Sequence, residues 1–107
     1  MTNHVALKFL NRLFPFFFTI NRKLEVFQSG NKLKLLCPEI KPTSKLEEIF
    51  SLENPKIEVS FENINATDDT HFFWKSRRRP DLTLKGQMLL IEENELHFIG
   101  SPWVLQM

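Results

Sequence analysis

Several residue types are scarce in this 107-residue chain, and each scarcity removes a class of protein. A single cysteine excludes an internal disulfide and a CxxC-type metal site, which favours an intracellular, reducing compartment and a cytoplasmic location. The 14 basic and 13 acidic side chains leave a formal net charge of +1. Nothing in that balance draws the whole chain toward nucleic acid or an anionic membrane.

Long apolar runs are also missing. The most apolar stretch, residues 13–20, is interrupted by Pro15 and is far shorter than the ~20 residues that cross a bilayer. We therefore expect no membrane span in this segment. Tyrosine is absent, whereas there are eleven Phe and two Trp. Because a phenylalanine ring needs no hydrogen-bond partner, this composition favours a large buried core over polar chemistry.

The first half of the chain alternates between helix and strand signals. Residues 3–14 carry apolar side chains at helical spacing, and Pro15 ends that helix. Strands are expected at 16–20 and 24–28. A short helix follows near Leu33 and stops at Pro38.

A second short helix is expected after Ser44. Glu47 lies three residues beyond Ser44, a spacing typical of a capping box. Residues 57–61 alternate like a strand, although Phe61 and Ile64 fit a helical turn equally well, so both assignments stay open.

The last third of the chain predicts a β-meander. Its strands are expected at residues 71–76, 82–91 and 96–100, separated by polar turns. Gly86 interrupts the middle strand, which indicates a bulge or a close approach of another backbone.

These elements predict one α+β domain over residues 1–107, with an N-terminal helix at 1–15 and the core at 16–107. The expected architecture is a five-stranded antiparallel sheet, with short helices on one face and the N-terminal helix on the other.

Several short motifs, together with the element order, resemble a known family. The carrying residues are Phe14-Pro15-Phe16, Leu24 to Gly30, Cys37-Pro38, Lys45-Leu46-Glu47-Glu48-Ile49-Phe50, Phe61-Glu62-Asn63-Ile64, Leu84-Lys85-Gly86-Gln87-Met88 and Phe98-Ile99-Gly100-Ser101-Pro102. The chain resembles the PAS-like domain associated with haem nitric-oxide sensors, which occurs in soluble guanylate cyclases and bacterial signalling histidine kinases.

The resemblance implies a non-catalytic domain for dimerisation and signal relay. Its implied partners are a second copy of the chain, a haem-based gas-sensor domain, and a kinase or cyclase output domain reached through a C-terminal helix. The chain would then be one part of a longer signalling protein, and a bacterial histidine kinase is the favoured context. The alternatives are a small-ligand-sensing PAS domain and the equivalent domain of a guanylate cyclase.

Candidate chemistry is sparse, and the residues themselves predict no catalytic group, metal site or cofactor. His4, His71 and His97 are scattered, whereas metal ligation needs convergent donors. Cys37 before Pro38 is interpreted as a small buried residue at a helix end. The basic run Lys75 to Arg79 fits a solvated turn better than a nucleic-acid contact, because its neighbouring aromatics belong to both faces of a strand.

A two-faced sheet leads independently to a dimer. The expected central strands place apolar side chains on both faces, as in sheets that are covered on both sides. One helix spans about 8–10 Å, too narrow to cover a five-stranded sheet about 20 Å wide. A second copy of the chain is the simplest cover for the remainder. The expected dimer interface comprises Val5, Phe9, Leu10, Leu13, Phe14, Phe17, Leu89 and Ile91.

Overall fold

The computed structural model describes residues 4–67 and 70–103, with side chains from Lys8 onward. The N-terminal helix is α1 (His4–Leu13), and it is followed by β1 (Phe18–Ile20) and β2 (Glu25–Ser29). Short elements come next: α2 (Asn31–Leu36), β3 (Ser44–Lys45), α3 (Leu46–Ile49), β4 (Phe50–Asn54) and α4 (Phe61–Ala66). The chain then forms β5 (Phe72–Ser76), β6 (Thr83–Glu92) and β7 (Glu95–Trp103).

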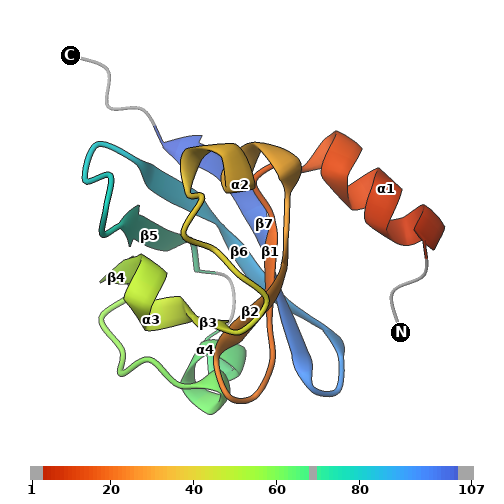
Figure 1. Ribbon diagram of the computed structural model, residues 1–107. Coiled ribbons are helices and arrows are strands. Elements are labelled where there is room, and N and C mark those ends of the chain that lie inside the picture. Colours follow the sequence, from red (N-terminus) through yellow and green to blue (C-terminus); the bar gives the residue numbers. More distant parts are fainter. Residues whose placement is uncertain (1–3, 68–69, 104–107) are drawn as a thin grey trace.

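The described strands form a single curled sheet of seven strands in the order β3-β2-β1-β7-β6-β5-β4 (Figure 1). Every neighbouring pair is antiparallel. The five predicted strands are the five central ones, but the prediction of a five-stranded sheet is wrong because both edge strands were missed. The α+β class is confirmed, whereas the PAS-like topology stays a prediction.

The edge strand β3 was missed because the sequence pattern at Ser44 predicted a helix cap. Ser44 is not the cap of α3, because the N-cap is Lys45 and no side chain bonds to that helix end. The Ser44 hydroxyl instead accepts a hydrogen bond from the Lys41 amide at 2.8 Å, and its backbone pairs with Val26 of β2. The predicted capping box is therefore wrong.

The region between Ile57 and Ile64 resolves as the helical alternative. Residues 57–59 lie outside any strand, and α4 begins at Phe61. Its cap is Ser60, whose Oγ accepts a hydrogen bond from the Asn63 amide at 3.1 Å. One of the helix's unpaired donors is thereby satisfied.

A cluster of aromatic rings fills the space between the sheet and the short helices. The Phe18 ring stacks on Phe98 and Phe50, with centroids 4.9 and 5.4 Å away. Trp74 meets Phe18 edge-on at 6.1 Å and stacks on Phe72 at 6.2 Å. Buried side chains of α2, α3 and α4 join the same core, so we call this side of the sheet the inner face.

The other side of the sheet, which we call the outer face, is buried at Thr19 and His97 and exposed at Leu89. Thr19, His97 and Leu89 form one row of it across β1, β7 and β6. Figure 1 shows α1 projecting away from the sheet, on the side opposite α3 and α4. Helix α1 thus lies on the outer-face side, and the prediction that it covers this face stays a prediction. Of the described apolar side chains of α1, Phe9 and Leu13 are exposed and Leu10 is half-buried.

Gly86 and Gly100 face each other across β6 and β7. A Cβ atom on Gly86 would lie 2.2 Å from the carbonyl oxygen of Ile99 and 2.5 Å from the Cα of Gly100. The close backbone approach expected at Gly86 is therefore present.

Candidate interaction surface

The large hydrophobic side chains that remain exposed are concentrated in two places. Eight such side chains are found in the described part of the chain. Three belong to the end of α1 and the residue after it (Phe9, Leu13, Phe14), and three belong to the end of β6 (Leu89, Leu90, Ile91). We call Phe9, Leu13, Phe14, Leu89 and Ile91 the α1–β6 patch; Leu90 pairs with the core residue Leu96 and lies on the opposite face of β6. The other two, Leu35 and Trp103, lie elsewhere.

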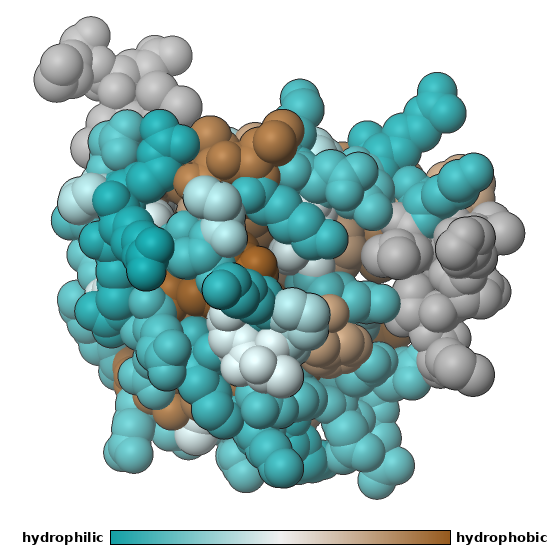
Figure 2. Space-filling view, in the orientation of Figure 1, coloured by the Kyte–Doolittle hydropathy of each residue, from teal (hydrophilic) through white to brown (hydrophobic). Residues whose placement is uncertain are grey.

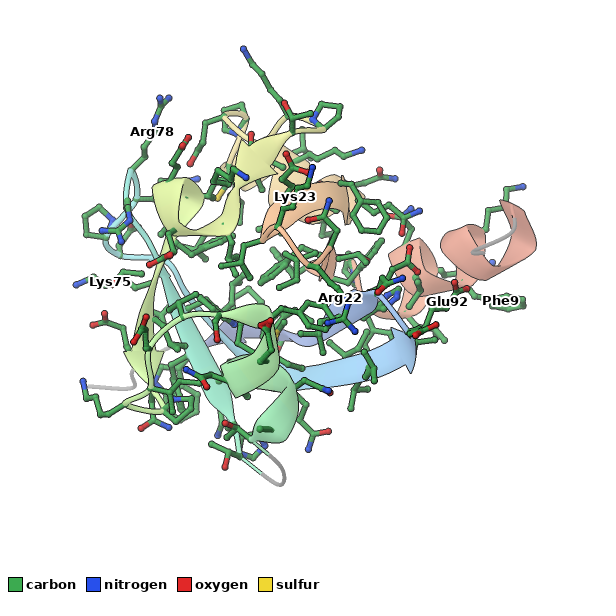
Figure 3. The ribbon with its side chains drawn as sticks, turned by 90° about the horizontal axis from the view of Figure 1, so that it is seen from below. Phe9, Arg22, Lys23, Lys75, Arg78 and Glu92 are labelled. Atoms are coloured by element: carbon green, nitrogen blue, oxygen red, sulfur yellow. The ribbon has the colours of Figure 1, made fainter. Side chains whose placement is uncertain are left out.

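Both parts of the α1–β6 patch project from the same side of the molecule. In Figure 1, α1 and the β6–β7 turn both extend to the right of the sheet. Figure 3 shows the same arrangement from below, with Phe9 and Glu92 at one end and Lys75 and Arg78 at the other. The outer face of the sheet lies on this side as well, so the patch is part of one continuous side of the domain.

Helix α1 is fixed to the domain at its C-terminal end. The Phe14 amide donates to the Leu10 carbonyl at 2.7 Å and extends the last turn. The Asn31 amide, at the start of α2, donates to Oδ1 of Asn11 at 2.9 Å. Leu10 is half-buried, whereas Phe9 is 60% and Leu13 65% exposed. The anchored end thus leaves Phe9 and Leu13 exposed to solvent.

The tip of the β6–β7 hairpin is held by one arginine. The Nη2 atom of Arg22, on the β1–β2 turn, donates to the Glu93 carbonyl at 3.2 Å, and its Nε donates to Oδ1 of Asn94. The guanidinium also lies 4.6 Å from the centre of the Phe61 ring at the start of α4. Arg22 therefore links the hairpin, the β1–β2 turn and an inner-face helix. It fixes the β6 end of the patch in position.

A buried histidine lies next to the patch. His97 pairs with Leu89 of β6 and with Thr19 of β1, and it is 2% exposed. Its Nδ1 atom is 3.1 Å from the Thr19 hydroxyl, whereas its Nε2 atom has no partner among the described residues. Burial lowers the pKa of His97, and the nearby Glu92 carboxylate opposes part of that shift. The imidazole is therefore held neutral.

At the far end of the outer face, two aromatic rings hold a lysine. The Lys85 ammonium lies 4.4 Å from the ring centre of Trp103 and 5.7 Å from that of Phe73. The two rings meet edge-on at 5.7 Å. This cluster orders the last described residue of β7, where the chain continues beyond the described part.

The charged turns lie at opposite ends of β6. Arg77, Arg78 and Arg79 are exposed on the β5–β6 turn, as the sequence predicts for a solvated turn. The turn is also tied to α3, because the Arg77 amide donates to the Ile49 carbonyl at 3.0 Å. The β6–β7 turn carries the acidic residues, so the domain has a basic end and an acidic end (Figure 3).

The predicted interface residues have several outcomes. Phe9, Leu13, Phe14, Leu89 and Ile91 are all exposed, and they belong to the α1 segment and the end of β6, which extend to the same side in Figure 1. Leu10 is half-buried beside them.

Two further predicted residues are not on this surface. Phe17 is 0% exposed, so it belongs to the protomer's interior. The side chain of Val5 lies outside the described residues. Leu90 was not predicted as an interface residue because strict alternation assigns it to the inner face. The observed register agrees with that assignment, because Leu90 pairs with the core residue Leu96.

Other candidate sites contain little chemistry. Among the described residues, no three His, Cys, Asp or Glu side chains converge on a metal position. His71 is exposed, and the side chain of His4 is outside the described part. Cys37 is fully buried at the end of α2, as predicted, and burial, followed by the Glu39 charge, raises the pKa of its thiol. Within residues 4–67 and 70–103, no helix is long and apolar enough to cross a membrane.

Comparison with known proteins identifies the family. The model of the family described as "Heme NO binding associated" matches residues 3–81. The soluble guanylate cyclase subunit alpha-1 of Rattus norvegicus is 32% identical over 104 residues, which cover 87% of this chain and 15% of the relative. The alpha-1 subunit of Mus musculus is 31% identical and the alpha-2 subunit of Homo sapiens 30%, both over 104 residues and 87% of this chain, covering 15% and 14% of the relative.

This chain belongs to the haem-NO-binding-associated family. The resemblance inferred from the sequence motifs is thereby confirmed. The chain spans about 15% of the length of these curated relatives, all of which are soluble guanylate cyclase subunits by name.

Proposed function

We propose that this haem-NO-binding-associated domain is a non-catalytic dimerisation and signal-relay module that pairs through the α1–β6 patch. The observation that carries the proposal is the concentration of exposed apolar side chains. Five of the eight in the described residues form this patch, at the end of α1 and on the outer face at the end of β6. A monomeric domain seldom leaves so many large apolar groups uncovered together.

The energetics favour an interface over an accidental patch. Fully burying a large apolar side chain contributes roughly 1.5–3 kcal/mol. In a two-fold pair each residue is buried twice, because the same surface serves both protomers. Phe9 and Leu13, which are the most exposed of the α1 residues, would therefore supply much of the association energy.

The charges around the patch also fit a dimer in which α1 of one protomer lies over the end of β6 of its partner. Helix α1 carries Lys8 and Arg12, both exposed, beside its apolar stripe. The β6–β7 turn carries Glu93, also exposed, beside the apolar end of β6. A partner's α1 lying over the end of β6 would bring these opposite charges together at the rim, which favours the correct orientation more than it adds affinity.

The same arrangement suggests how a signal would pass through the domain. Strand β7 begins at Glu95 beside the patch and ends at Trp103, where the chain continues. A small rotation between protomers about the patch would change the angle at which each chain leaves the domain. Rigid-body rotation about an interface is a common switching mode. Arg22 and the Lys85 cluster would keep the intervening strand rigid.

The relatives favour a cyclase context over the histidine kinase context, because the similar proteins described above are guanylate cyclase subunits by name. We propose that the domain operates in the cytoplasm beside a haem-based gas-sensor domain and passes its signal to a cyclase output. The partner in the cell is a second copy or a closely similar subunit.

The ligand-sensing alternative has less support. A ligand site on the inner face would need space between the sheet and the helices. That region holds the stacked rings of Phe18, Phe50 and Phe98 and the edge of Trp74. A filled aromatic core favours relay.

Light scattering on a size-exclusion column tests the proposal directly. The chain should run as a dimer at micromolar concentration, and the double variant Phe9→Glu, Leu13→Glu should run as a monomer with an unchanged circular-dichroism spectrum. Leu35→Glu is the matched control, because Leu35 is an exposed leucine on α2 that lies outside the patch. A wild-type chain that stays monomeric at high micromolar concentration would refute the proposal. So would a double variant that remains a folded dimer.

A further inference from the structure

Strand β2 has a partly open edge. On one side β2 pairs with β1 as far as Ser29. On its other side β3 pairs only with Glu25 and Val26, so residues 27–29 have no neighbouring strand in the described part of the chain. The register also slips here, which leaves Phe27 as an extra residue opposite β1.

A groove of about 270 Å³ runs along this open edge. Its walls are β2 on one side and residues 40–42 with Lys34 of α2 on the other. In Figure 2, hydrophobic surface is visible among hydrophilic side chains on the face where residues 37–45 cross in front of β2. Since a water molecule takes about 30 Å³, the groove has room for roughly nine waters or a short stretch of extended peptide.

The lining combines apolar surface with positive charge. Val26, Phe27, Ile40 and Pro42 supply the apolar part. Lys34 and Lys41 also line the groove, and both are exposed. Residues 31–45 contain four lysines and one glutamate, a local excess of +3 in a chain whose total is +1. The ion pair recorded in this region joins Lys45 to Glu25 and leaves Lys34 and Lys41 uninvolved.

We propose that this groove binds an extended acidic peptide segment of a partner, which adds to the sheet beside β2 in line with β3. Backbone hydrogen bonds to residues 27–29 would supply affinity, as in other cases of strand addition. Alternate side chains of such a strand point to opposite sides. Apolar side chains would rest on Phe27 and Ile40, and carboxylates would meet Lys34 and Lys41. This inference does not depend on the dimer, because the groove and the α1–β6 patch share no residue.

Fluorescence anisotropy with a defined probe tests the proposal. The probe is a fluorescein-labelled seven-residue peptide of alternating glutamate and valine, with blocked ends, titrated with the full 107-residue chain. We expect saturable binding that weakens as salt is raised. A peptide with lysine in place of glutamate should not bind. A peptide with proline at its central position should bind at least tenfold more weakly, because proline removes a backbone donor.

Matched protein variants separate the groove from general charge. The double variant Lys34→Glu, Lys41→Glu should weaken binding about tenfold or more, since two exposed ion pairs become two repulsions. Lys56→Glu is the control, because Lys56 is exposed on the loop before α4 and should leave affinity unchanged. Equal binding of the lysine peptide, no effect of the central proline, or equal losses in the two protein variants would each overturn the proposal. So would an absence of binding by the folded wild-type chain, whether it is a monomer or a dimer.

Discussion

Replacing Gly86 by alanine should destabilise the domain although it adds only one methyl group. The new Cβ atom would lie 2.2 Å from the Ile99 carbonyl oxygen and 2.5 Å from the Gly100 Cα. Both atoms belong to the backbone of β7, so neither can rotate away. The central strands β6 and β7 must separate instead, which strains the longest pairing in the sheet.

The size of this effect follows from two opposing terms. Overpacking a tightly packed interior costs about 1–3 kcal/mol. Replacing glycine by alanine also lowers the conformational entropy of the unfolded chain, which stabilises the folded state by about 0.4–1 kcal/mol. Because the contacted atoms are backbone, the overpacking cost should be about 2–3 kcal/mol. The net loss should therefore be about 1–2.6 kcal/mol, which lowers the melting temperature of a domain of this size by roughly 4–20 °C.

Urea denaturation and thermal melting followed by circular dichroism measure the loss. Gln87→Ala is the matched control, because Gln87 is the exposed neighbour of Gly86 on β6 and its replacement should change stability by less than about 0.5 kcal/mol. If Gly86→Ala is as stable as Gln87→Ala, then β6 and β7 do not approach each other as closely as the structure describes.

Two further predictions concern protonation and helix capping. Because burial lowers the pKa of His97, the folded state holds the ring neutral, and the unfolded chain takes up a proton below pH about 6.5. The free energy of unfolding should therefore fall as pH decreases from about 6.5. Urea denaturation at a series of pH values measures this decrease. The variant His97→Gln should lose the part of the decrease that is due to His97, whereas the control His71→Gln should keep it. Ser60→Ala should cost about 0.5–2 kcal/mol, because it leaves the Asn63 amide at the start of α4 unpaired, and Ser60→Thr should recover most of the loss in the same assay. A flat pH profile for wild-type protein would contradict the first prediction, and an unmoved Ser60→Ala midpoint would contradict the second.

Strong local periodicity explains what was predictable from the sequence. Residues of α1 repeat at helical spacing and end at Pro15, and β5 alternates with Phe72 and Trp74 on the buried side. Such patterns reflect burial against one core, so they identify long elements without knowledge of the tertiary structure. Cys37 before Pro38 was predictable for the same reason, since a helix end and a buried residue coincide there.

The edge strands could not be predicted because tertiary pairing creates them. Strand β3 has two residues, and Ser44 has a pattern that is equally typical of a helix cap. Strand β4 begins at Phe50, directly after the four-residue helix α3. Phe50 fits the apolar side of that helix equally well, so the sequence did not distinguish the helix end from the strand start. Short segments of this kind take their conformation from their neighbours, here β2 and β5.

Most residues of the interaction surface could be predicted from the sequence, but the orientation of α1 relative to the sheet could not. Apolar side chains on both faces of β6 indicated that one face needs an additional cover, which identified Leu89 and Ile91. The sequence gives no direction for α1, whose anchoring depends on the contact between Asn11 and the start of α2. The same limit explains Phe17, which alternation assigned to the outer face although it is fully buried within the protomer.

An inter-protomer distance measurement tests most directly the claim that the domain pairs through the α1–β6 patch. A nitroxide label on Ile91→Cys, in a Cys37→Ala background that removes the native buried thiol, places one spin at the edge of the patch in each protomer. Pulsed dipolar spectroscopy should give a short, narrow distance for this label. An Arg78→Cys label at the opposite end of β6 should give a clearly longer distance. A short distance at position 78 together with none at position 91, or no dipolar signal from either label in concentrated protein, would contradict the account.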